Sequence, residues 1–192
     1  MKKSTPVVLW LLFIVSIVVF IGFSFHIYNR AVAQKAYKAE IQLRIEREDL
    51  ALKNWVMGHS NKISEKTAME IVTECRKTPH QLFLMALIEE ESNFVPSALS
   101  NKGAIGLGQI MPVHAPELIE QKIIKDNRDL FDVGTNIQAT SFVFRKMYMN
   151  SNYNLRKTMI LYLGKHDKKY FEEIIINYFE LMAIVTQVRE NK

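Results

Sequence analysis

The hydrophobic pattern of the chain is most uniform near its beginning. From Val7 to Phe25 the sequence VVLWLLFIVSIVVFIGFSF runs for 19 residues without a charged side chain. A helix of this length rises about 1.5 Å per residue and so roughly matches a hydrocarbon core of about 30 Å. Because no polar face interrupts the run, a buried helix in a soluble protein is also disfavoured. The pattern predicts a single membrane-spanning helix over about 7–25, within an N-terminal anchor of residues 1–28.

A cleavable signal peptide is the main alternative for this segment. Lys2 and Lys3 supply a basic start, and Ala31-Val32-Ala33 resembles a cleavage site. However, the apolar core of a signal peptide usually has about 7 to 15 residues, and here the core is longer and the site is distant from it. The pattern therefore favours an uncleaved anchor. Basic residues occur on both sides of the span, so the positive-inside rule leans only slightly towards a cytoplasmic C-terminus.

Residues 29–59 have a different composition. They are rich in Ala, Lys, Glu, Arg and Leu, contain no Pro, and have their only Gly at position 58. Good helix formers without breakers indicate a helical stalk. The charges alternate in sign, as on a solvated helix face, and the apolar spacing is too irregular to predict a coiled coil.

Residues 60–192 carry helix signals and almost no strand signals, so we expect one mainly α-helical domain. Ser64 can cap a helix through about Lys77. Thr78, followed by Pro79 and Gln81, has the pattern of a capping box for the next helix. Further helices are predicted from Asp132 to about Met149, from Asn152 or Asn154 to near Gly164, and from Asp167 onward. The last of these has an apolar stripe typical of core packing, formed by Phe171, Ile174, Ile175, Tyr178, Met182 and Val185.

Three consecutive carboxylates, Glu89, Glu90 and Glu91, end the apolar run LFLMALI. On a helix that begins at Pro79, Glu91 shares the face of Leu84, because residues seven apart lie on the same side. Glu89 and Glu90 are rotated away from that face and are expected to point to solvent or to its border. Only Glu91 is therefore placed unusually for a charged side chain.

A carboxylate among apolar groups either finds a partner or shifts its pKa upwards. A raised pKa is what a general acid needs near neutral pH. A partly exposed Glu at a fraying helix end, or one paired with a Lys, would have the same position in the sequence. Helix geometry alone leaves both interpretations open.

The residues after Glu91 decide between them. The stretch ESNFVPSALSNKGAIGLGQIMP, residues 91–112, resembles the catalytic core of the lytic transglycosylase family, whose SLT-type domain is lysozyme-like. Thirteen positions over 22 residues match without a gap: Glu91, Ser92, Phe94, Pro96, Ser100, Gly103, Ala104, Gly106, Leu107, Gln109, Ile110, Met111 and Pro112. Weaker matches follow at residues 130–132 and at Asn136-Ile137.

The resemblance implies a role for several residues. Glu91 would be the catalytic acid, Ser100 and Gln109 would contact the sugar or its acetamido group, and Met111 would line the cleft. Tyr162, in LYLGK, aligns with a family Tyr that hydrogen-bonds the catalytic Glu. For Ile110 the preferred interpretation is core packing.

The chain also departs from the family pattern. Leu163 stands where the family has Asn, and Thr140 stands where it prefers Gly. Both positions belong to the floor of the family's substrate cleft.

The implied chemistry needs only one carboxylate. Most glycosidases use two, one as acid and one as nucleophile or base. In lytic transglycosylases a single Glu protonates the glycosidic oxygen of peptidoglycan and then removes a proton from the C6 hydroxyl, which leaves 1,6-anhydro-N-acetylmuramic acid. The three aspartates at 126, 129 and 132 are therefore interpreted as loop or capping residues. Two alternatives stay open: a hydrolytic muramidase of the same fold, and a non-catalytic peptidoglycan-binding scaffold.

Other classes of function are disfavoured. GAIGLG is not a nucleotide-binding glycine pattern, and the net charge of +5 comes from basic residues interleaved with acidic ones, so we expect no nucleic-acid partner. The five histidines lack the spacing of metal ligands, so neither a metal nor another cofactor is expected. Cys75 is the single cysteine, so the chain cannot form an internal disulfide, and we expect Cys75 to be a small buried residue.

The substrate implied by the resemblance fixes the expected location. Peptidoglycan lies outside the cytoplasmic membrane, so we expect a single-pass protein of the bacterial inner membrane with its domain facing the periplasm or cell wall. A long domain can be translocated despite a weak charge bias. Candidate partners, besides the glycan strands and the membrane, are secretion, conjugation or other envelope-spanning machines that need a passage through the wall.

Overall fold

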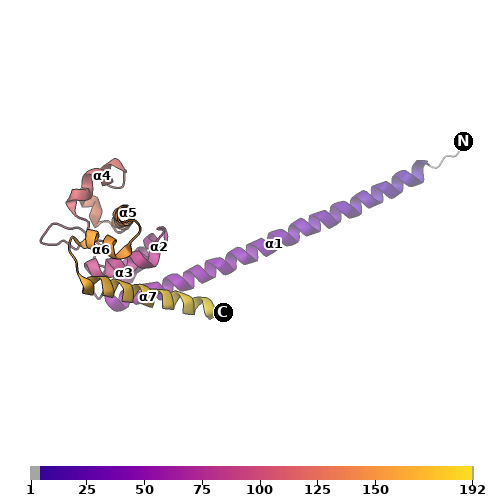
Figure 1. Cartoon of the computed structure of the whole chain (residues 1–192). Coiled ribbons are helices and arrows are strands. Elements are labelled where there is room, and N and C mark those ends of the chain that lie inside the picture. The colour runs from indigo at the N-terminus through magenta and orange to yellow at the C-terminus, as the bar shows by residue number, and fades with distance from the viewer. Residues whose placement is uncertain (1–4, 192) are drawn as a thin grey trace. The chain divides into compact units, whose positions relative to one another are not determined.

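The computed structural model describes residues 5–191, with the side chains of residues 10–17 and 19–191. Every regular element in this range is helical: α1 (Thr5–His59), α2 (Glu65–Arg76), α3 (Gln81–Ser92), η1 (Pro112–His114), α4 (Ala115–Glu120), η2 (Asn127–Phe131), α5 (Val133–Asn150), α6 (Leu155–Leu163) and α7 (Lys168–Glu190). Figure 1 shows their order. The predicted mainly α fold is confirmed.

The chain divides into two units, Met1–Ile45 and Glu46–Lys192. The described part of the first unit is helical, and those of its apolar side chains that the structure describes between Trp10 and Tyr37 are exposed. This helix is long and apolar enough to cross a membrane, judged by length and composition, with a mean hydropathy of 2.4 over its most apolar window. Lys2 and Lys3 lie outside the described residues.

The second unit begins before residue 60, because the end of α1 is part of its core. Leu52 and Val56 have no exposed surface, and Trp55 is 8% exposed. The Trp55 ring packs edge-on against Phe94, with 5.7 Å between centroids, and its Nε1 donates to Glu180 in α7 at 3.2 Å. Residues 46–59, predicted as part of a stalk, therefore pack within the domain. The predicted domain boundaries stay predictions.

A buried carboxylate also connects these helices. Glu48 is 3% exposed, and its oxygens accept hydrogen bonds from Arg189 of α7 at 2.8 Å and from Arg76 of α2 at 3.5 Å. Arg76 also pairs with Asp49. Buried charges need such partners, and removing one leaves the others uncompensated. The end of α1 is thus held to both α2 and α7.

Helix α3 lies at the centre of the second unit and contacts α2, α5 and α7 (Figure 1). Its residues from Phe83 to Ile88 are all buried, so the helix has no solvent face along half of its length. The main core surrounds it. A second cluster lies between α4, η2 and α5 and contains Ile105, Ile110, Leu118, Ile124, Leu130, Ala139 and Val143. Ile110, at 1% exposed, is a core residue as interpreted, and Cys75 is fully buried as expected.

Most of the predicted helix starts are confirmed. The side chains of Ser64, Asp132, Asn154 and Asp167 each accept a hydrogen bond from a backbone N–H in the first turn of α2, α5, α6 and α7. Asp126 and Asp129 form a capping box at η2, so the interpretation of these aspartates as capping residues is also confirmed.

The capping box predicted at Thr78 is wrong. Helix α3 begins at Gln81, two residues after Pro79, with His80 at the N-cap and no side-chain cap. The Thr78 hydroxyl instead donates to the Cys75 carbonyl oxygen at 2.6 Å, at the end of α2. One hydroxyl lies between two helix ends here, and it satisfies the acceptor of the preceding helix rather than the donors of the next.

The predicted stripe on α7 is rotated. Its buried residues are Tyr170, Ile174, Asn177, Leu181 and Val185, whereas Met182 is 39% exposed. This face packs against α3 and carries two polar side chains, Tyr170 and Asn177. A prediction based on apolar residues alone does not include them. One of them, Tyr170, contacts the candidate catalytic residue.

Candidate active site

Glu91 lies in the last turn of α3. The helix ends directly after it, since Asn93 adopts a left-handed conformation with φ 48° and its N–H donates to the Glu89 carbonyl oxygen at 2.8 Å. Phe94 follows with φ 62° and is fully buried against Trp55. A left-handed aromatic residue is uncommon and is held in place by its packing. This turn fixes the position of Glu91 and starts the loop that follows.

A phenol contacts the Glu91 carboxylate. The Tyr170 hydroxyl, in the first turn of α7, donates a hydrogen bond to Oε1 of Glu91. Tyr170 is 7% exposed, and burial together with the negative charge of Glu91 raises the pKa of its phenol well above the ordinary value. Tyr170 is therefore a permanent donor at physiological pH.

The environment of Glu91 raises the pKa of its carboxyl from 4.5 to about 7. Burial is the main cause, because it disfavours the charged form. The hydrogen bond from Tyr170 acts in the opposite direction, and the neighbouring charge of Glu90 adds to the rise. A carboxyl whose pKa lies near neutrality can both give up a proton and take one back.

Glu89 and Glu90 are half-buried, at the border of the solvent face, which is one of the two predicted positions. The Glu89 carboxylate faces α7 and accepts a hydrogen bond from Asn177 at 2.6 Å. Desolvation by burial is the main cause that raises the pKa of both carboxyls. Glu89 therefore lies at the border of the solvent face, where α7 partly covers this side of α3. Even so, only Glu91 receives the hydrogen bond from a buried phenol.

The loop 98–111 is stabilised by its own hydrogen bonds. Isolated bridges join Leu99 to Ile105 and Ile105 to Ile110. Ser100 Oγ accepts hydrogen bonds from the N–H groups of Ala104 at 2.9 Å and Lys102 at 3.3 Å. Within this loop, Ser100 thus holds a tight turn.

Gln109 also binds inside the loop. Its Nε2 donates to the carbonyl oxygens of Gly106 at 2.9 Å and Ala98 at 3.5 Å. Met111 is half-buried in extended backbone at the end of the loop. The sugar-binding roles of Ser100, Gln109 and Met111 stay predictions.

Asn136 of α5 anchors the loop to the domain. Its Oδ1 accepts from the Gly108 N–H at 2.8 Å, while its Nδ2 donates to the carbonyl oxygens of Leu130 at 2.7 Å and Ile105 at 3.0 Å. Asn136 is 1% exposed, so each of these bonds satisfies a buried polar group.

Two glycines allow the loop backbone to lie this close to Asn136 and Thr140 of α5. A Cβ on Gly106 would lie 2.1 Å from Asn136 Nδ2 and 2.3 Å from the Leu130 carbonyl oxygen. A Cβ on Gly108 would lie 2.0 Å from Oγ1 of Thr140. Thr140, which stands where the family prefers Gly, is fully buried and donates to the Asn136 carbonyl oxygen at 2.8 Å.

Tyr162 lies near Glu91 but does not orient it by the predicted hydrogen bond. Its hydroxyl donates to the Gly108 carbonyl oxygen at 2.7 Å. Burial and the negative charge of Glu91 raise the pKa of its phenol. The phenol of Tyr162 therefore binds the loop backbone, and the direct donor to Glu91 is Tyr170 instead.

The described residues thus bring together Glu91, Tyr162 and Tyr170 beside the loop backbone at Gly108. Tyr170 is the residue that sequence reasoning missed. Its only local signal is its position three residues after the Asp167 cap, four before the buried Ile174. Within residues 5–191, no group of three His, Cys, Asp or Glu side chains lies close enough together to hold a metal ion.

Comparison with known families identifies the domain. The model of the family described as Transglycosylase SLT domain matches residues 69–164, half of the chain. This range contains Glu91, the loop and Tyr162, and it ends before Tyr170. No curated protein matches the chain.

The chain belongs to the SLT transglycosylase domain family. This confirms the resemblance and the mainly α, lysozyme-like fold. It also assigns a lytic-transglycosylase type of function, with peptidoglycan as the substrate.

Proposed function

We propose that the protein is a lytic transglycosylase in which Glu91 acts first as the acid and then as the base. It cleaves the β-1,4 bond between N-acetylmuramic acid and N-acetylglucosamine and leaves a 1,6-anhydro ring on the muramic acid. The observation that carries this proposal is the Glu91 carboxyl, which lies half-buried in the last turn of α3 beside the Tyr170 phenol, in surroundings that raise its pKa to about 7.

The first step needs protonated Glu91. Its proton passes to the glycosidic oxygen while the bond from C1 of the muramic acid to that oxygen breaks. The acetamido oxygen of the substrate stabilises the electron-poor C1. The new Glu91 carboxylate keeps the hydrogen bond from Tyr170, which disperses part of its charge in a site of low dielectric constant.

The second step restores the acid. The Glu91 carboxylate removes the proton from the C6 hydroxyl of the muramic acid, and O6 forms a bond to C1. No water is consumed and no second carboxylate is needed. A pKa near the working pH suits both steps, since neither the acid nor the base form is strongly disfavoured.

The test is mass spectrometry of the products from purified peptidoglycan, using the full chain in nanodiscs. We expect anhydro-muropeptides, and their loss in Glu91→Gln. Glu90→Gln is the matched control, because it removes the adjacent carboxylate on the same helix and should keep most of the activity. Products heavier by one water would identify a hydrolytic muramidase. Absence of products from the wild-type protein would favour a binding scaffold, the alternative that Leu163 suggests.

We further propose that residues 1–28 anchor the protein in the inner membrane, with the domain on the periplasmic side. The long exposed apolar helix supports the anchor, and the peptidoglycan substrate of the family supports the orientation. Envelope-spanning machines that need a passage through the wall are candidate partners.

The orientation can be tested with a membrane-impermeant maleimide on intact cells. Cys75 is fully buried and its thiol pKa is raised by burial, so its background reactivity should be low. Asn127→Cys, at an exposed position of the domain, should be labelled without lysis. Labelling only after lysis would place the domain in the cytoplasm and contradict the proposal.

A further inference from the structure

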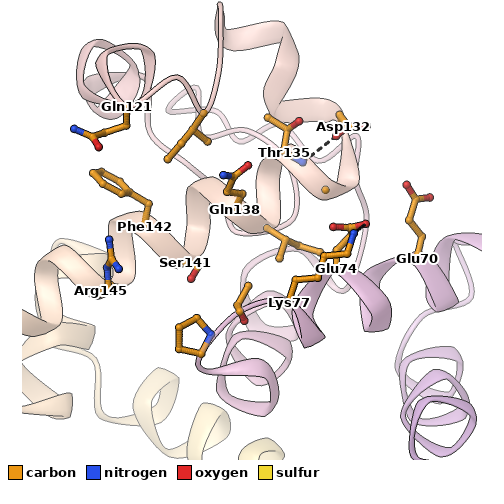
Figure 2. A pocket seen from close by; sticks show the side chains of 15 residues that line it. Glu70, Glu74, Lys77, Gln121, Asp132, Thr135, Gln138, Ser141, Phe142 and Arg145 are labelled. Carbon is orange, nitrogen blue, oxygen red and sulfur yellow. Dashed lines mark hydrogen bonds and ion pairs between the residues drawn. The ribbon is translucent and has the colours of Figure 1, made fainter. Parts of the chain in front are cut away.

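A groove with a volume of about 820 Å³ lies between α2 and α5. It is closed by the connection from α2 to α3 and by residues 121–123, which follow α4. Figure 2 shows side chains from these segments converging on it. A volume of this size is in the range of sites that bind small ligands or peptide segments.

The groove is separate from the candidate active site. Asn136 and Thr140 face the loop, whereas Gln138 and Arg145 line the groove. At about 100° per residue, Gln138 and Arg145 lie on the opposite side of α5 from those two residues. The groove also includes Thr78 and Pro79, which precede the first residue of α3, while Glu91 lies about 15 Å further along that helix.

The groove is electrically polarised along its length. Glu70 and Glu74 of α2 and Asp132, at the start of α5, lie at one end, and Arg145 lies at the other beside Phe142 (Figure 2). Asp132 and Arg145 are thirteen residues apart on one helix, which corresponds to about 20 Å. A ligand that fills the groove therefore meets negative charge at one end and positive charge at the other.

Two of these charges have no partner within residues 5–191. Glu74 pairs with Lys77 at 2.5 Å, and Asp132 accepts from the Thr135 N–H at 2.9 Å. In contrast, neither the Glu70 carboxylate nor the Arg145 guanidinium forms an ion pair or a side-chain hydrogen bond with a described residue. Both ends of the groove thus keep one charge available to a ligand.

Apolar side chains also line the groove. Ile123 and Phe142 are half-buried, and Phe142 lies next to Arg145, whereas Ile137 is 1% exposed and offers almost no surface to a ligand (Figure 2). At about 3.3 Å per residue, an extended chain of six or seven residues spans about 20 Å. The groove therefore matches an extended peptide with a basic residue at one end, an apolar residue in the middle and an acidic residue at the other end.

We propose that the α2–α5 groove binds an extended segment of a partner protein with this charge pattern. The stem peptides of peptidoglycan fit it less well, because they carry several carboxylates and the acidic end of the groove repels them. A stem attached to the glycan at Glu91 would also have to pass around α5. This proposal does not depend on the activity assigned to Glu91.

Three labelled heptapeptides with blocked ends and a central Leu test the groove. They carry Lys and Glu, two Lys, or two Glu at their first and seventh positions, and Ser elsewhere. Fluorescence anisotropy measures their binding to the full chain in nanodiscs. We expect the peptide with Lys and Glu to bind at least fivefold more tightly than either of the others.

Reversal of one groove charge should change this preference. In Arg145→Glu the peptide with two Lys should become the tightest ligand, while peptidoglycan cleavage stays unchanged. Lys157→Glu is the matched control, since it makes the same charge change at an exposed residue outside the groove, and the original order should remain.

Three results would overturn the proposal. The first is no binding of any of these peptides at millimolar concentration, and the second is the same order of affinity in Arg145→Glu as in the wild-type protein. The third is displacement of the labelled peptide by free stem pentapeptide at lower concentration than by the unlabelled heptapeptide, which would assign the groove to the cell wall instead.

Discussion

The Tyr170 hydroxyl donates a hydrogen bond to Glu91 Oε1 from 79 residues further along the chain. The two side chains come together because α7 packs along α3, the buried central helix of the domain. Burial raises the pKa of Glu91, and the phenol limits that rise. The acidity of the candidate catalytic residue therefore depends on the position of α7.

Tyr170→Phe should shift the pH dependence of activity. The hydrogen bond stabilises the ionised form of Glu91, so its removal should move the pKa of the acid above the present value of about 7. The falling limb of the kcat/KM profile should move to higher pH, and activity at its optimum should drop by about tenfold, as for a catalytic group that has lost its positioning.

Tyr162→Phe is the control for this measurement. It removes a buried phenol hydroxyl that bonds to Gly108 rather than to Glu91. The midpoint of its profile should stay near that of the wild-type protein. Equal shifts in the two variants would show that Tyr170 has no specific effect on the acid.

Glu91→Gln should stabilise the fold at alkaline pH. The carboxyl pKa is about 7 in the folded state and 4.5 as its ordinary value, so the folded state retains the proton over this interval. The contribution of Glu91 to stability is therefore greatest below pH 4.5 and is lost as the pH rises through 7. A neutral amide avoids this loss.

The difference corresponds to about 3 kcal/mol at about 1.4 kcal/mol per pKa unit, as an upper value. Urea unfolding at pH 4 and at pH 8 measures it, with Glu90→Gln as the control. The advantage of Glu91→Gln over the wild-type protein should grow with pH. An advantage that is the same at both pH values would contradict the raised pKa.

Gly108→Ala should destabilise the domain, and Thr140→Gly should partly restore it. The new Cβ would overlap the Thr140 side chain, and overpacking of this kind costs about 1 to 3 kcal/mol. Removing that side chain opens the space. Thermal unfolding of the two single variants and the double variant gives the coupling energy between the positions.

Gly106 and Gly103 supply two controls for this pair. Gly106→Ala should not be rescued by Thr140→Gly, because its Cβ meets Asn136 and the Leu130 backbone. Gly103→Ala should cost only about 1 kcal/mol, since its φ of 82° is strained for Ala but the nearest atom is 3.8 Å away. Rescue of Gly106→Ala by Thr140→Gly would show that the effect is not local.

A fragment of residues 46–192 should fold, whereas residues 60–192 should not form a stable domain. The shorter fragment lacks Leu52, Trp55 and Val56, each of which is worth about 2 kcal/mol when buried. It also lacks Glu48, which leaves Arg76 and Arg189 without that partner. Together these losses approach the whole stability of a typical domain, about 5 to 15 kcal/mol.

Circular dichroism melting curves of the two fragments distinguish these outcomes. A cooperative transition at the same temperature in both would show that residues 46–59 are dispensable for the fold.

Local signals were sufficient to predict much of the fold. A side-chain cap such as Ser64 or Asp167 binds backbone within three residues, so the sequence contains both partners of the bond. Thr78 shows the limit of such signals, because two helix ends lie within reach of its hydroxyl. The choice between them depends on how the chain turns.

Long-range contacts could not be predicted in the same way. Asn136 bonds to Gly108 across 28 residues, and Tyr170 bonds to Glu91 across 79. A polar residue within an apolar stripe is not assigned to the buried face of a helix unless the partner helix, with its own polar groups, is known. The rotated stripe on α7 has this cause, since its polar members face the glutamates of α3.

The span between Glu91 and Tyr170 also sets the order in which the protein matures. Ribosomes make the chain from the amino end, so Glu91 is synthesised 79 residues before the phenol that tunes it. Until those residues have followed and α7 has packed against α3, the Glu91 carboxylate lacks the hydrogen bond from Tyr170. A nascent or truncated chain thus carries the family motif of residues 91–112 without the complete surroundings of its glutamate.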